Sequence, residues 1–341
     1  MHILIIGAGF GGLRVARELR KKAPSADITV IDRKNYFEVT YATLRTLTDP
    51  GFANGAGRVE YAAFLDAEFI QDSVVELQRN SAHLHSGKQI DFDYAVVATG
   101  TSYPSLPIAK SETSLSLASR NKEIACANQE LLSNQAIRIV GAGAVGAELA
   151  GEIKSRFPES EVELYDLGDR VLQHLTPKAS SIAADLLKTL GVHLHLNTPI
   201  NTDDEYIGLT YWCRGPKIQT GFIADDDIKT ATGELKVDSY LQVQNQPTWF
   251  AVGDAAALTD AKMGATATHQ ARFVAENLSR LGRSKSSLRR YKPQPFMSLV
   301  PIGHRSGVAQ FKSITATWQP VISWKQKDLL IDYALKQVGA R

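Results

Sequence analysis

The feature that most constrains this chain is a repeat: two glycine-rich turns lie 134 residues apart, and an aspartate follows each at the same distance. The first turn spans residues 7–12 (GAGFGG) and leads to Asp32, whereas the second spans residues 141–146 (GAGAVG) and leads to Asp166. One such turn is a weak signal, but each copy here follows a hydrophobic strand and has its acid 20 positions after the third glycine. Together they predict two βαβ units that each bind a dinucleotide. A chain with two dinucleotide sites is expected to pass electrons from one to the other.

Each glycine of the first turn has its own role. Gly7 permits the tight turn, Gly9 lets the backbone approach a pyrophosphate, and Gly12 allows close packing of helix on strand. The N-terminus of the following helix supplies N–H groups and partial positive charge for phosphates, and Asp32 can accept hydrogen bonds from a ribose. The residues expected to contact this cofactor are Gly7, Gly9, Phe10, Gly11, Gly12, Asp32 and Arg33.

The second unit is predicted to contain a strand over 137–140, a helix over 143–157 and a strand over 161–165. Asp166 would repel the 2′-phosphate of NADPH, which favours NADH, although Arg170 is near enough in sequence to offset part of that charge. The residues expected to bind the second nucleotide are Gly141, Gly143, Ala144, Val145, Gly146 and Asp166.

Length and composition indicate an ordinary globular protein of two or three domains. The 341 residues are 44% hydrophobic and 22% charged, and no apolar run approaches the roughly 20 residues of a membrane-spanning helix. A strand is expected from residue 2 onward, which leaves no room for a signal peptide, and His2 excludes myristoylation of a glycine at that position. We therefore expect a cytoplasmic protein.

The net charge of +2 conceals an asymmetry. From Arg280 onward there are 12 basic residues and two acidic ones, a net charge of +10, whereas the preceding 279 residues carry a net charge of −8. A basic segment of this kind favours attraction to anionic lipid on the inner face of a membrane, or it is a solvated surface. Nucleic-acid binding is not expected, because the segment contains no recognisable reader motif.

Cysteine and histidine usage predicts no metal site. Cys126 and Cys213 are 87 residues apart and neither belongs to a C-x-x-C motif, which argues against a dithiol relay, an iron–sulfur cluster and structural zinc. Cys126 lies in a helix-like stretch over 121–132 and is expected to be a small core residue. Two histidine pairs, at 83/85 and 193/195, alternate as on exposed strand faces and have no further ligands nearby.

Two distant strands identify the first nucleotide by resemblance. One ends in Ala98-Thr99-Gly100 and the other in Gly253-Asp254, and together with both glycine turns they resemble the FAD/NAD(P)H oxidoreductase superfamily. The resemblance implies an α/β fold with two Rossmann-like domains, FAD in the first unit and NADH or NADPH in the second. It further implies that Asp254 binds the ribityl and pyrophosphate region, that Val74 contacts the adenine, and that Glu148 lies near the nicotinamide and flavin. The added cofactor residues are Val74, Ala98, Thr99, Gly100, Gly253 and Asp254.

The C-terminal segment is similar to the ferroptosis suppressor branch of apoptosis-inducing-factor-like NAD(P)H:quinone oxidoreductases, relatives of type II NADH dehydrogenases. The stretches that carry this likeness are 291–293, 296–311 and 325–336. It implies a quinone as acceptor and Lys336 as a proton donor near the flavin, and it places His269 beside the quinone. Thr266, however, stands where that family has a glutamine.

The second domain is expected to depart from the family over 196–221. Its usual hairpin is predicted to be shortened to 197–209, and Arg214 stands where a small hydroxyl residue is common. The predicted domains are 1–110 with 242–284 for FAD, 111–241 for NAD(P)H, and a basic module over 285–341.

Three functions stay open on the sequence. The first is a flavoprotein that passes a hydride from NADH to FAD and then two electrons to a quinone. The second is a reductase of a soluble acceptor such as ferredoxin, rubredoxin or monodehydroascorbate, and the third is a nucleotide-gated interaction switch. The oligomeric state is equally open, with a homodimer as one option.

Overall fold

The computed structural model describes residues 1–284, 287–317 and 319–341, and its core is a pair of parallel sheets. The first sheet has the order β17-β9-β1-β2-β5, and all its strands are parallel. The glycine turn follows its central strand, so the nucleotide edge lies at the carboxyl ends of the strands. The strands are β1 (His2–Ile6), β2 (Asp27–Asp32), β5 (Glu68–Gln71), β9 (Tyr94–Val97) and β17 (Trp249–Ala251).

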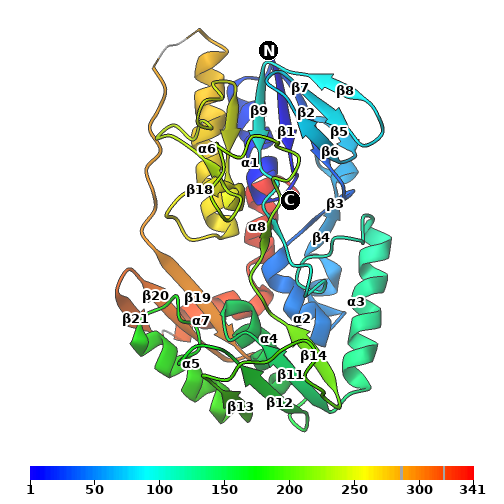
Figure 1. The fold of residues 1–341 in the computed structure, drawn as a ribbon, viewed down its shortest axis with the longest axis vertical. Coiled ribbons are helices and arrows are strands. Elements are labelled where there is room, and N and C mark those ends of the chain that lie inside the picture. Colours follow the sequence, from blue (N-terminus) through cyan, green and yellow to red (C-terminus); the bar gives the residue numbers. More distant parts are fainter. Residues whose placement is uncertain (285–286, 318) are drawn as a thin grey trace.

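Alternating side chains of the central strand enter two different cores. Ile3 and Ile5 pack with α1 (Phe10–Lys22) and α6 (Gly264–Leu281), which lie side by side on one face (Figure 1). Leu4 and Ile6 face a three-stranded antiparallel sheet on the other side. This separation follows from the two-residue period of a strand. The covering strands are β6 (Val74–Leu77), β7 (Ser81–Leu84) and β8 (Gln89–Asp91).

The second sheet has the order β13-β12-β11-β14 and is also parallel. Helix α4 (Ala144–Arg156) follows its glycine turn, and α5 (Pro177–Thr189) packs beside α4. Helix α3 (Leu117–Leu132) lies at the edge of the domain against α2 (Thr43–Thr48) of the first domain. The strands are β11 (Ala136–Val140), β12 (Glu161–Tyr165), β13 (Val192–His195) and β14 (Leu209–Trp212).

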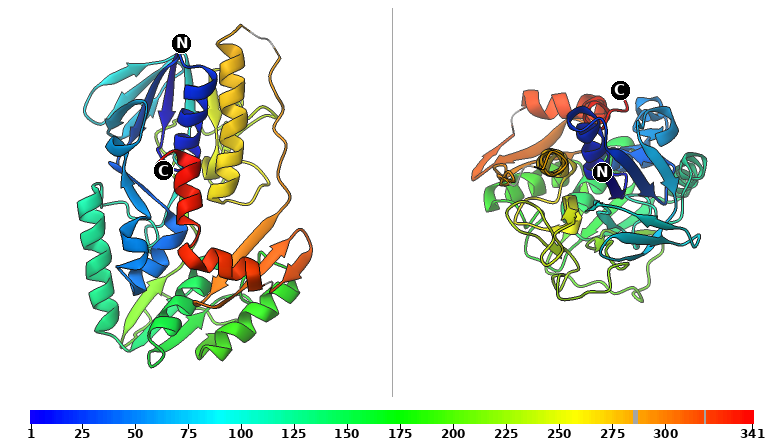
Figure 2. Two further views of the ribbon diagram at one scale, coloured as in Figure 1. Left: turned by 180° about the vertical axis from the view of Figure 1, so that it is seen from behind. Right: turned by 90° about the horizontal axis from the view of Figure 1, so that it is seen from above.

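The C-terminal segment contacts both domains. Its antiparallel sheet packs on α4 and α5 of the second domain, while its last helix packs on α1 of the first, as the rear view in Figure 2 shows. Positions 285, 286 and 318 of this predicted module lie outside the described residues. The elements are β19 (Met297–Ile302), β20 (Ser306–Phe311), β21 (Ile314–Ala316), α7 (Gln319–Asp328) and α8 (Ile331–Val338).

Short elements connect these layers. The described residues contain three two-stranded sheets, β3 with β4, β10 with β15 and β16 with β18, and the β10–β15 pair links the end of the first domain to the second. The short strands are β3 (Tyr36–Glu38), β4 (Arg58–Glu60), β10 (Thr101–Ser102), β15 (Lys217–Ile218), β16 (Leu235–Lys236) and β18 (Ala256–Ala257). Among the described residues, no helix is both long and apolar enough to cross a bilayer.

Two local predictions were wrong. Residues 196–208 form turns and bends without a strand, so the shortened hairpin is absent; their run of polar and acidic residues has low strand propensity. Cys126 is exposed on α3 and is not part of the core. That helix packs through Arg120, Ile124 and Leu131, which leaves the cysteine on its outer face.

Candidate functional site

The two glycine turns agree in their contacts as well as in their spacing. Gly7 and Gly141 have φ angles of +100° and +111°, and a Cβ on either would lie within 2.6 Å of a backbone oxygen, that of Ala98 or Cys213. A Cβ on Gly12 or Gly146 would lie 1.9 Å from the carbonyl oxygen of the first glycine. Both turns therefore require glycine at these positions, because any side chain would collide with backbone.

The middle glycines leave room for a ligand. Apart from the glycine itself and its two chain neighbours, no atom of the described chain lies within 4 Å of a Cβ built on Gly9 or Gly143, each of which precedes a helix. Within the same described ranges, no side chain caps the N-terminus of α1 or α4. The first N–H groups of both helices are therefore available to phosphate oxygens, as the pyrophosphate of a dinucleotide requires.

The two predicted aspartates occupy equivalent positions. Asp32 Oδ2 accepts a hydrogen bond from the Ala8 N–H at 2.7 Å, and Asp166 Oδ2 accepts one from Ala142 N–H at 2.5 Å. The second oxygen of each accepts from the backbone two residues later, at Lys34 or Gly168. Each carboxylate is thus fixed beside its glycine turn, at the end of β2 or β12.

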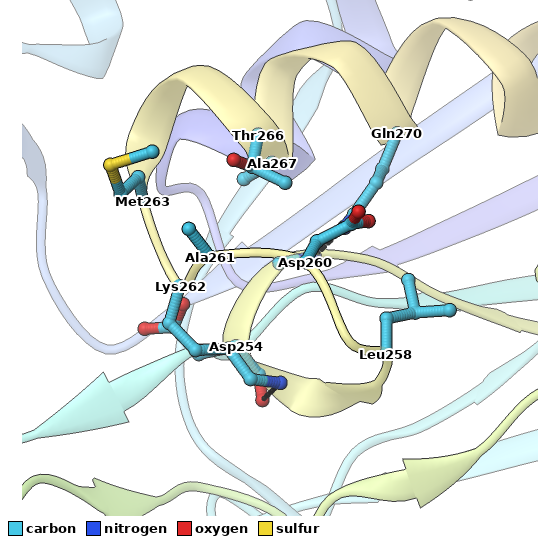
Figure 3. Close-up of a pocket in the computed structure, with 10 residues that line it drawn as sticks. Asp254, Leu258, Asp260, Ala261, Lys262, Met263, Thr266, Ala267 and Gln270 are labelled. Atoms are coloured by element: carbon cyan, nitrogen blue, oxygen red, sulfur yellow. Dashed lines mark hydrogen bonds between the residues drawn. The ribbon is translucent and has the colours of Figure 1, made fainter. Parts of the chain in front are cut away.

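The first unit has polar groups that fit FAD. The Thr99 hydroxyl, two residues after the end of β9, is buried and has no hydrogen-bond partner among the described residues. On the neighbouring strand end, Asp254 Oδ2 accepts a hydrogen bond from the Thr101 hydroxyl at 2.9 Å, and the Gly253 N–H donates to Gln270 at 2.7 Å. Asp254 and Gln270 line the same pocket (Figure 3). An orphaned buried hydroxyl indicates a missing partner, since such groups are normally bonded. The residues present therefore fit a bound dinucleotide.

Other predicted contacts of the first unit lie around this edge. Phe10 packs edge-on against Phe37, with ring centroids 5.0 Å apart. Gly11 is packed so closely that a Cβ would lie 2.9 Å from Val252, while Gly100 has a φ angle of +62°. Val74 begins β6 and is half-buried, and Arg33 follows β2 with its carbonyl accepting from Gln71 at 3.0 Å.

The sequence did not identify Lys110, which lies at the same edge of the first sheet as Gly100. The Nζ of Lys110 lies 3.4 Å from the position of a Cβ on Gly100. Burial lowers the pKa of Lys110, and the nearby carboxylates of Asp254 and Asp32 oppose that shift. The side chain stands where it can meet an anionic cofactor, but its loop carries no motif that would have identified it.

The second unit differs at the strand end. Its sheet ends at β14, so the described residues contain no strand beside it and no equivalent of Asp254. Cys213 takes the place of Ala98 against the glycine turn, and Arg214 follows it with its guanidinium 4.1 Å from the Trp212 ring centroid. Ala144 and Val145 form the half-buried first turn of α4.

Glu148 meets a cation that the sequence did not identify. Its Oε1 lies 4.0 Å from Nζ of Lys325 on α7, and that ammonium also donates to the Leu299 carbonyl at 2.5 Å. Burial raises the pKa of Glu148 to about 7, with Lys325 opposing the shift. Burial also lowers the pKa of Lys325. Groups tuned in this way suit proton transfer near neutral pH.

The other two predicted catalytic residues lie apart from this pair. Lys336 is 63% exposed on α8, and its Nζ is 2.8 Å from Asp332 one turn earlier. His269 Nε2 is 3.0 Å from the Lys292 carbonyl, and its ring packs against Phe273. Within the stretch 325–336, to which the family likeness pointed, the structure brings Lys325 to Glu148.

Fold and site together define a flavoprotein with two dinucleotide units, an NAD(P)H-driven oxidoreductase that binds FAD in addition to NAD(P)H. The chain belongs to the pyridine nucleotide-disulphide oxidoreductase family, whose model matches residues 1–274. This confirms the predicted α/β fold class.

Comparison with known proteins also confirms the predicted branch. Ferroptosis suppressor protein 1 of Mus musculus is 29% identical over 364 residues, covering 98% of this chain and 95% of that protein. The NADH dehydrogenase-like protein YutJ of Bacillus subtilis is 24% identical, with 82% and 83% covered. Among solved structures, the sulfide:quinone oxidoreductase of Aquifex aeolicus has a TM-score of 0.80 at 20% identity, covering 99% of this chain and 91% of that one. NDH2 of Plasmodium falciparum in complex with NADH has a TM-score of 0.77 at 14% identity, covering 99% and 96%.

Proposed function

We propose that this protein is an NADH:quinone oxidoreductase. The observation that carries the proposal is the half-buried Glu148–Lys325 pair, which joins α4 of the second nucleotide unit to α7 of the C-terminal segment. Bound FAD supplies the hydride acceptor and the two-electron donor. The coenzyme preference is supported by Asp166, a carboxylate at the end of β12 that would repel a 2′-phosphate.

Proton supply is the task that the chain's own residues perform. Reduction of a quinone to a quinol consumes two electrons and two protons, and NADH delivers both electrons but only one proton, as hydride. With a pKa raised to about 7, Glu148 is protonated often enough to give a proton and is recharged from solvent. Lys325 takes the role predicted for Lys336, because its ammonium lies beside that carboxyl and its pKa is lowered.

Steady-state turnover of the FAD-loaded protein with NADH and a short-chain quinone tests this assignment. E148Q removes the exchangeable proton, and we expect it to lower kcat by about a hundredfold. K325M should also lower kcat strongly, whereas K336M, a matched change in an exposed lysine, should leave it unchanged. Equal effects of K325M and K336M would contradict the assignment. Full activity with acidic electron-transfer proteins and none with quinones would contradict the acceptor.

We further propose that the C-terminal segment docks on an anionic bilayer, the solvent of a hydrophobic quinone. Among the residues whose exposure the structure describes, five of the ten exposed large hydrophobic ones lie between positions 297 and 333, although this segment is a small part of the chain. Met297, Phe311 and Ile314 are exposed cross-strand neighbours at one end of β19, β20 and β21, and Lys312 lies in the same hairpin tip. Exposed apolar groups among basic residues suit the interface of an anionic membrane.

Flotation with liposomes tests the docking surface. The wild type should float with anionic vesicles and less with neutral ones, and F311S/I314S should remain in solution while still reducing a soluble quinone. L167S/I207S changes two comparably exposed apolar residues of the second domain and should float as the wild type does. Salt-independent flotation with neutral and anionic vesicles alike would contradict the electrostatic part, and flotation of F311S/I314S would contradict this surface.

A further inference from the structure

One buried arginine connects the three parts of the molecule. Arg45, on α2 of the first domain, donates from Nη2 and Nε to the Glu152 carboxylate at 2.7 and 2.9 Å. Its Nη1 donates to the Gln326 backbone carbonyl at 3.0 Å, and its Nη2 also donates to the Gln326 side-chain oxygen. The side chains of Arg45 and Glu152 are only 6% and 4% exposed, so this is a bidentate ion pair shielded from water.

Both anchors of Arg45 adjoin the residues assigned to proton transfer. Glu152 lies one helical turn after Glu148 on α4, and Gln326 directly follows Lys325 on α7. Gln326 is in turn fixed by donating from Nε2 to the Gly303 carbonyl at 2.7 Å. Arg45 therefore holds the helix of the acid and the helix of the amine in one fixed arrangement.

The β19–β20 turn completes the cluster. His304 Nε2 lies 3.0 Å from Glu152 Oε2, and the His304 N–H donates to Ser155 on α4 at 3.2 Å. Hydrogen bonds from His304 and Arg45 lower the pKa of Glu152 against the effect of burial. Glu152 is thus held as a carboxylate, and it balances the arginine charge.

We infer that Arg45, Glu152 and Gln326 are positioning residues that set the separation of Glu148 from Lys325 and the charge that Glu148 experiences. The inference rests on the proposed function for the role of that pair. The charged groups that act on Glu148 are Lys325 from α7, Arg45 from α2 and Glu152 from its own helix. Because Arg45 and Glu152 oppose each other at Glu148, removing either one alone shifts its protonation in a predictable direction.

Replacing Arg45 and replacing Glu152 should shift the pKa of Glu148 in opposite directions. R45Q leaves the Glu152 charge uncompensated and should raise the pKa of Glu148, whereas E152Q leaves Arg45 uncompensated and should lower it, each by about one unit. The double variant R45Q/E152Q should return the pKa toward the wild-type value. Loss of alignment should lower kcat with the soluble quinone by about tenfold or more in all three variants, with little change in KM for NADH.

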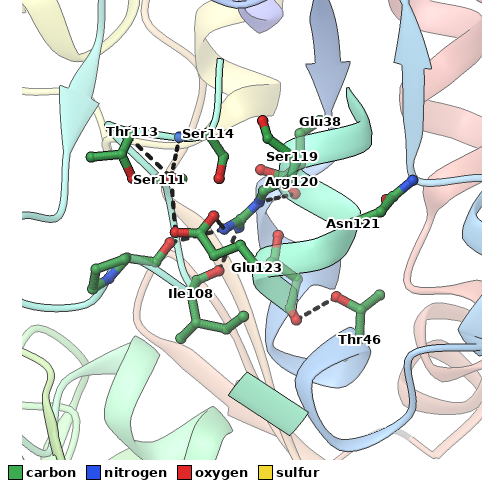
Figure 4. Close-up of polar contacts among 12 residues, drawn as sticks. Glu38, Thr46, Ile108, Ser111, Thr113, Ser114, Ser119, Arg120, Asn121 and Glu123 are labelled. Carbon is green, nitrogen blue, oxygen red and sulfur yellow. Dashed lines mark hydrogen bonds and ion pairs between the residues drawn. The ribbon is translucent and has the colours of Figure 1, made fainter. Parts of the chain in front are cut away.

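A second buried arginine provides the matched control. Arg120 on α3 is fully buried, donates to Glu38 at 3.0 Å and to Glu123 at 2.7 Å, and also bonds the Ile108 carbonyl (Figure 4). It does not contribute to the pKa shift of Glu148. R120Q should therefore lower the melting temperature about as much as R45Q does, and leave the pKa of Glu148 unchanged.

The experiment follows the pKa of Glu148 in the FAD-loaded protein by carbon NMR of labelled glutamate carboxyls, assigned by the signal lost in E148Q. This measurement needs no acceptor, so a wrong quinone assignment would abolish quinone turnover without affecting it. Opposite shifts in R45Q and E152Q, with none in R120Q, are expected. Shifts in one direction, or shifts no larger than in R120Q, would overturn the inference. If R45Q does not fold, E152Q with E152D as the conservative rescue still decides it: a lowered pKa in E152Q that E152D restores supports the inference, and an unchanged pKa overturns it.

Discussion

The two nucleotide units share a glycine turn and differ one helical turn later. At equivalent positions, 134 residues apart, the first unit has Arg14 and Glu18 where the second has Glu148 and Glu152. Arg14 pairs with Glu18 at 2.9 Å on its own helix and bonds the Gln337 carbonyl of α8, so it anchors the chain end. The acids of the second unit instead face Lys325 and Arg45 from other helices. A repeated fold thus acquires different chemistry from the segments that pack on each copy.

The strand next to the turn differs as well. In the first unit, β17 lies beside β9 and contributes Asp254, whereas β14 of the second unit is an edge strand. We therefore expect the first site, which has this additional strand end, to suit a cofactor that stays bound. We expect the second site, whose edge strand has no further neighbour among the described residues, to suit a coenzyme that leaves after each turnover.

The largest effect should come from exchanging one glycine in each turn. G12A and G146A place a Cβ against the same carbonyl oxygen, so each should abolish its own site. We expect G12A to yield protein without flavin, whereas G146A stays yellow but is no longer reduced by NADH. Absorbance spectra before and after NADH distinguish the two. A yellow G12A or a G146A that is reduced normally would show that the units are assigned wrongly.

A smaller effect is expected on the free energy of unfolding when Glu148 or Arg14, which occupy equivalent positions in the two units, is replaced. The folded state holds the Glu148 proton more tightly than the unfolded chain, because its pKa is raised from the usual value of about 4.3 to about 7. The resulting cost of ionisation is absent below the unfolded pKa and develops as the pH rises between these two values. The free energy of unfolding of E148Q should therefore exceed that of the wild type by about 3–4 kcal/mol at pH 8 and by little at pH 4. R14Q should be destabilised at both pH values. Urea titrations of both variants check the contrast, and a pH-independent gain in E148Q would contradict it.

Replacing the aspartate of one unit should alter the binding of a different ligand from replacing the aspartate of the other. D166A removes the charge facing a 2′-phosphate and should improve kcat/KM for NADPH relative to NADH by about tenfold. D32A should instead weaken FAD retention and leave the coenzyme ratio unchanged. Initial rates with both coenzymes, at saturating FAD, measure the difference. An unaltered ratio in D166A would mean that Arg170 or another group sets the preference.

The smallest effect is expected at Thr99. Its hydroxyl has no partner in the described chain, so T99V should leave the stability of the flavin-free protein within about 0.5 kcal/mol of the wild type. The same change should weaken FAD binding by about 1 kcal/mol if the cofactor supplies the missing partner. Melting curves with and without FAD separate these effects. A T99V protein that binds FAD unchanged would remove this hydroxyl from the site.

The sequence predicted those features whose residues lie close together along the chain, and it did not predict contacts between residues far apart in the sequence. The glycine turns, Asp32 and Asp166 lie in local βαβ units, where spacing alone determines geometry, and the structure reproduces them. Lys325 could not be selected over Lys336, because only the tertiary packing that places α7 on β19 and β20 brings Lys325 to Glu148. Arg45 was missed for the same reason, since its partners lie 107 and 281 residues away along the chain.

The most direct test of the two-unit assignment is the visible absorbance spectrum of the purified protein before and after NADH. We predict a yellow protein whose flavin absorbance bleaches on addition of NADH and returns when a quinone is added. A colourless protein that cannot be reconstituted with FAD, or a yellow one that NADH does not reduce, would contradict it.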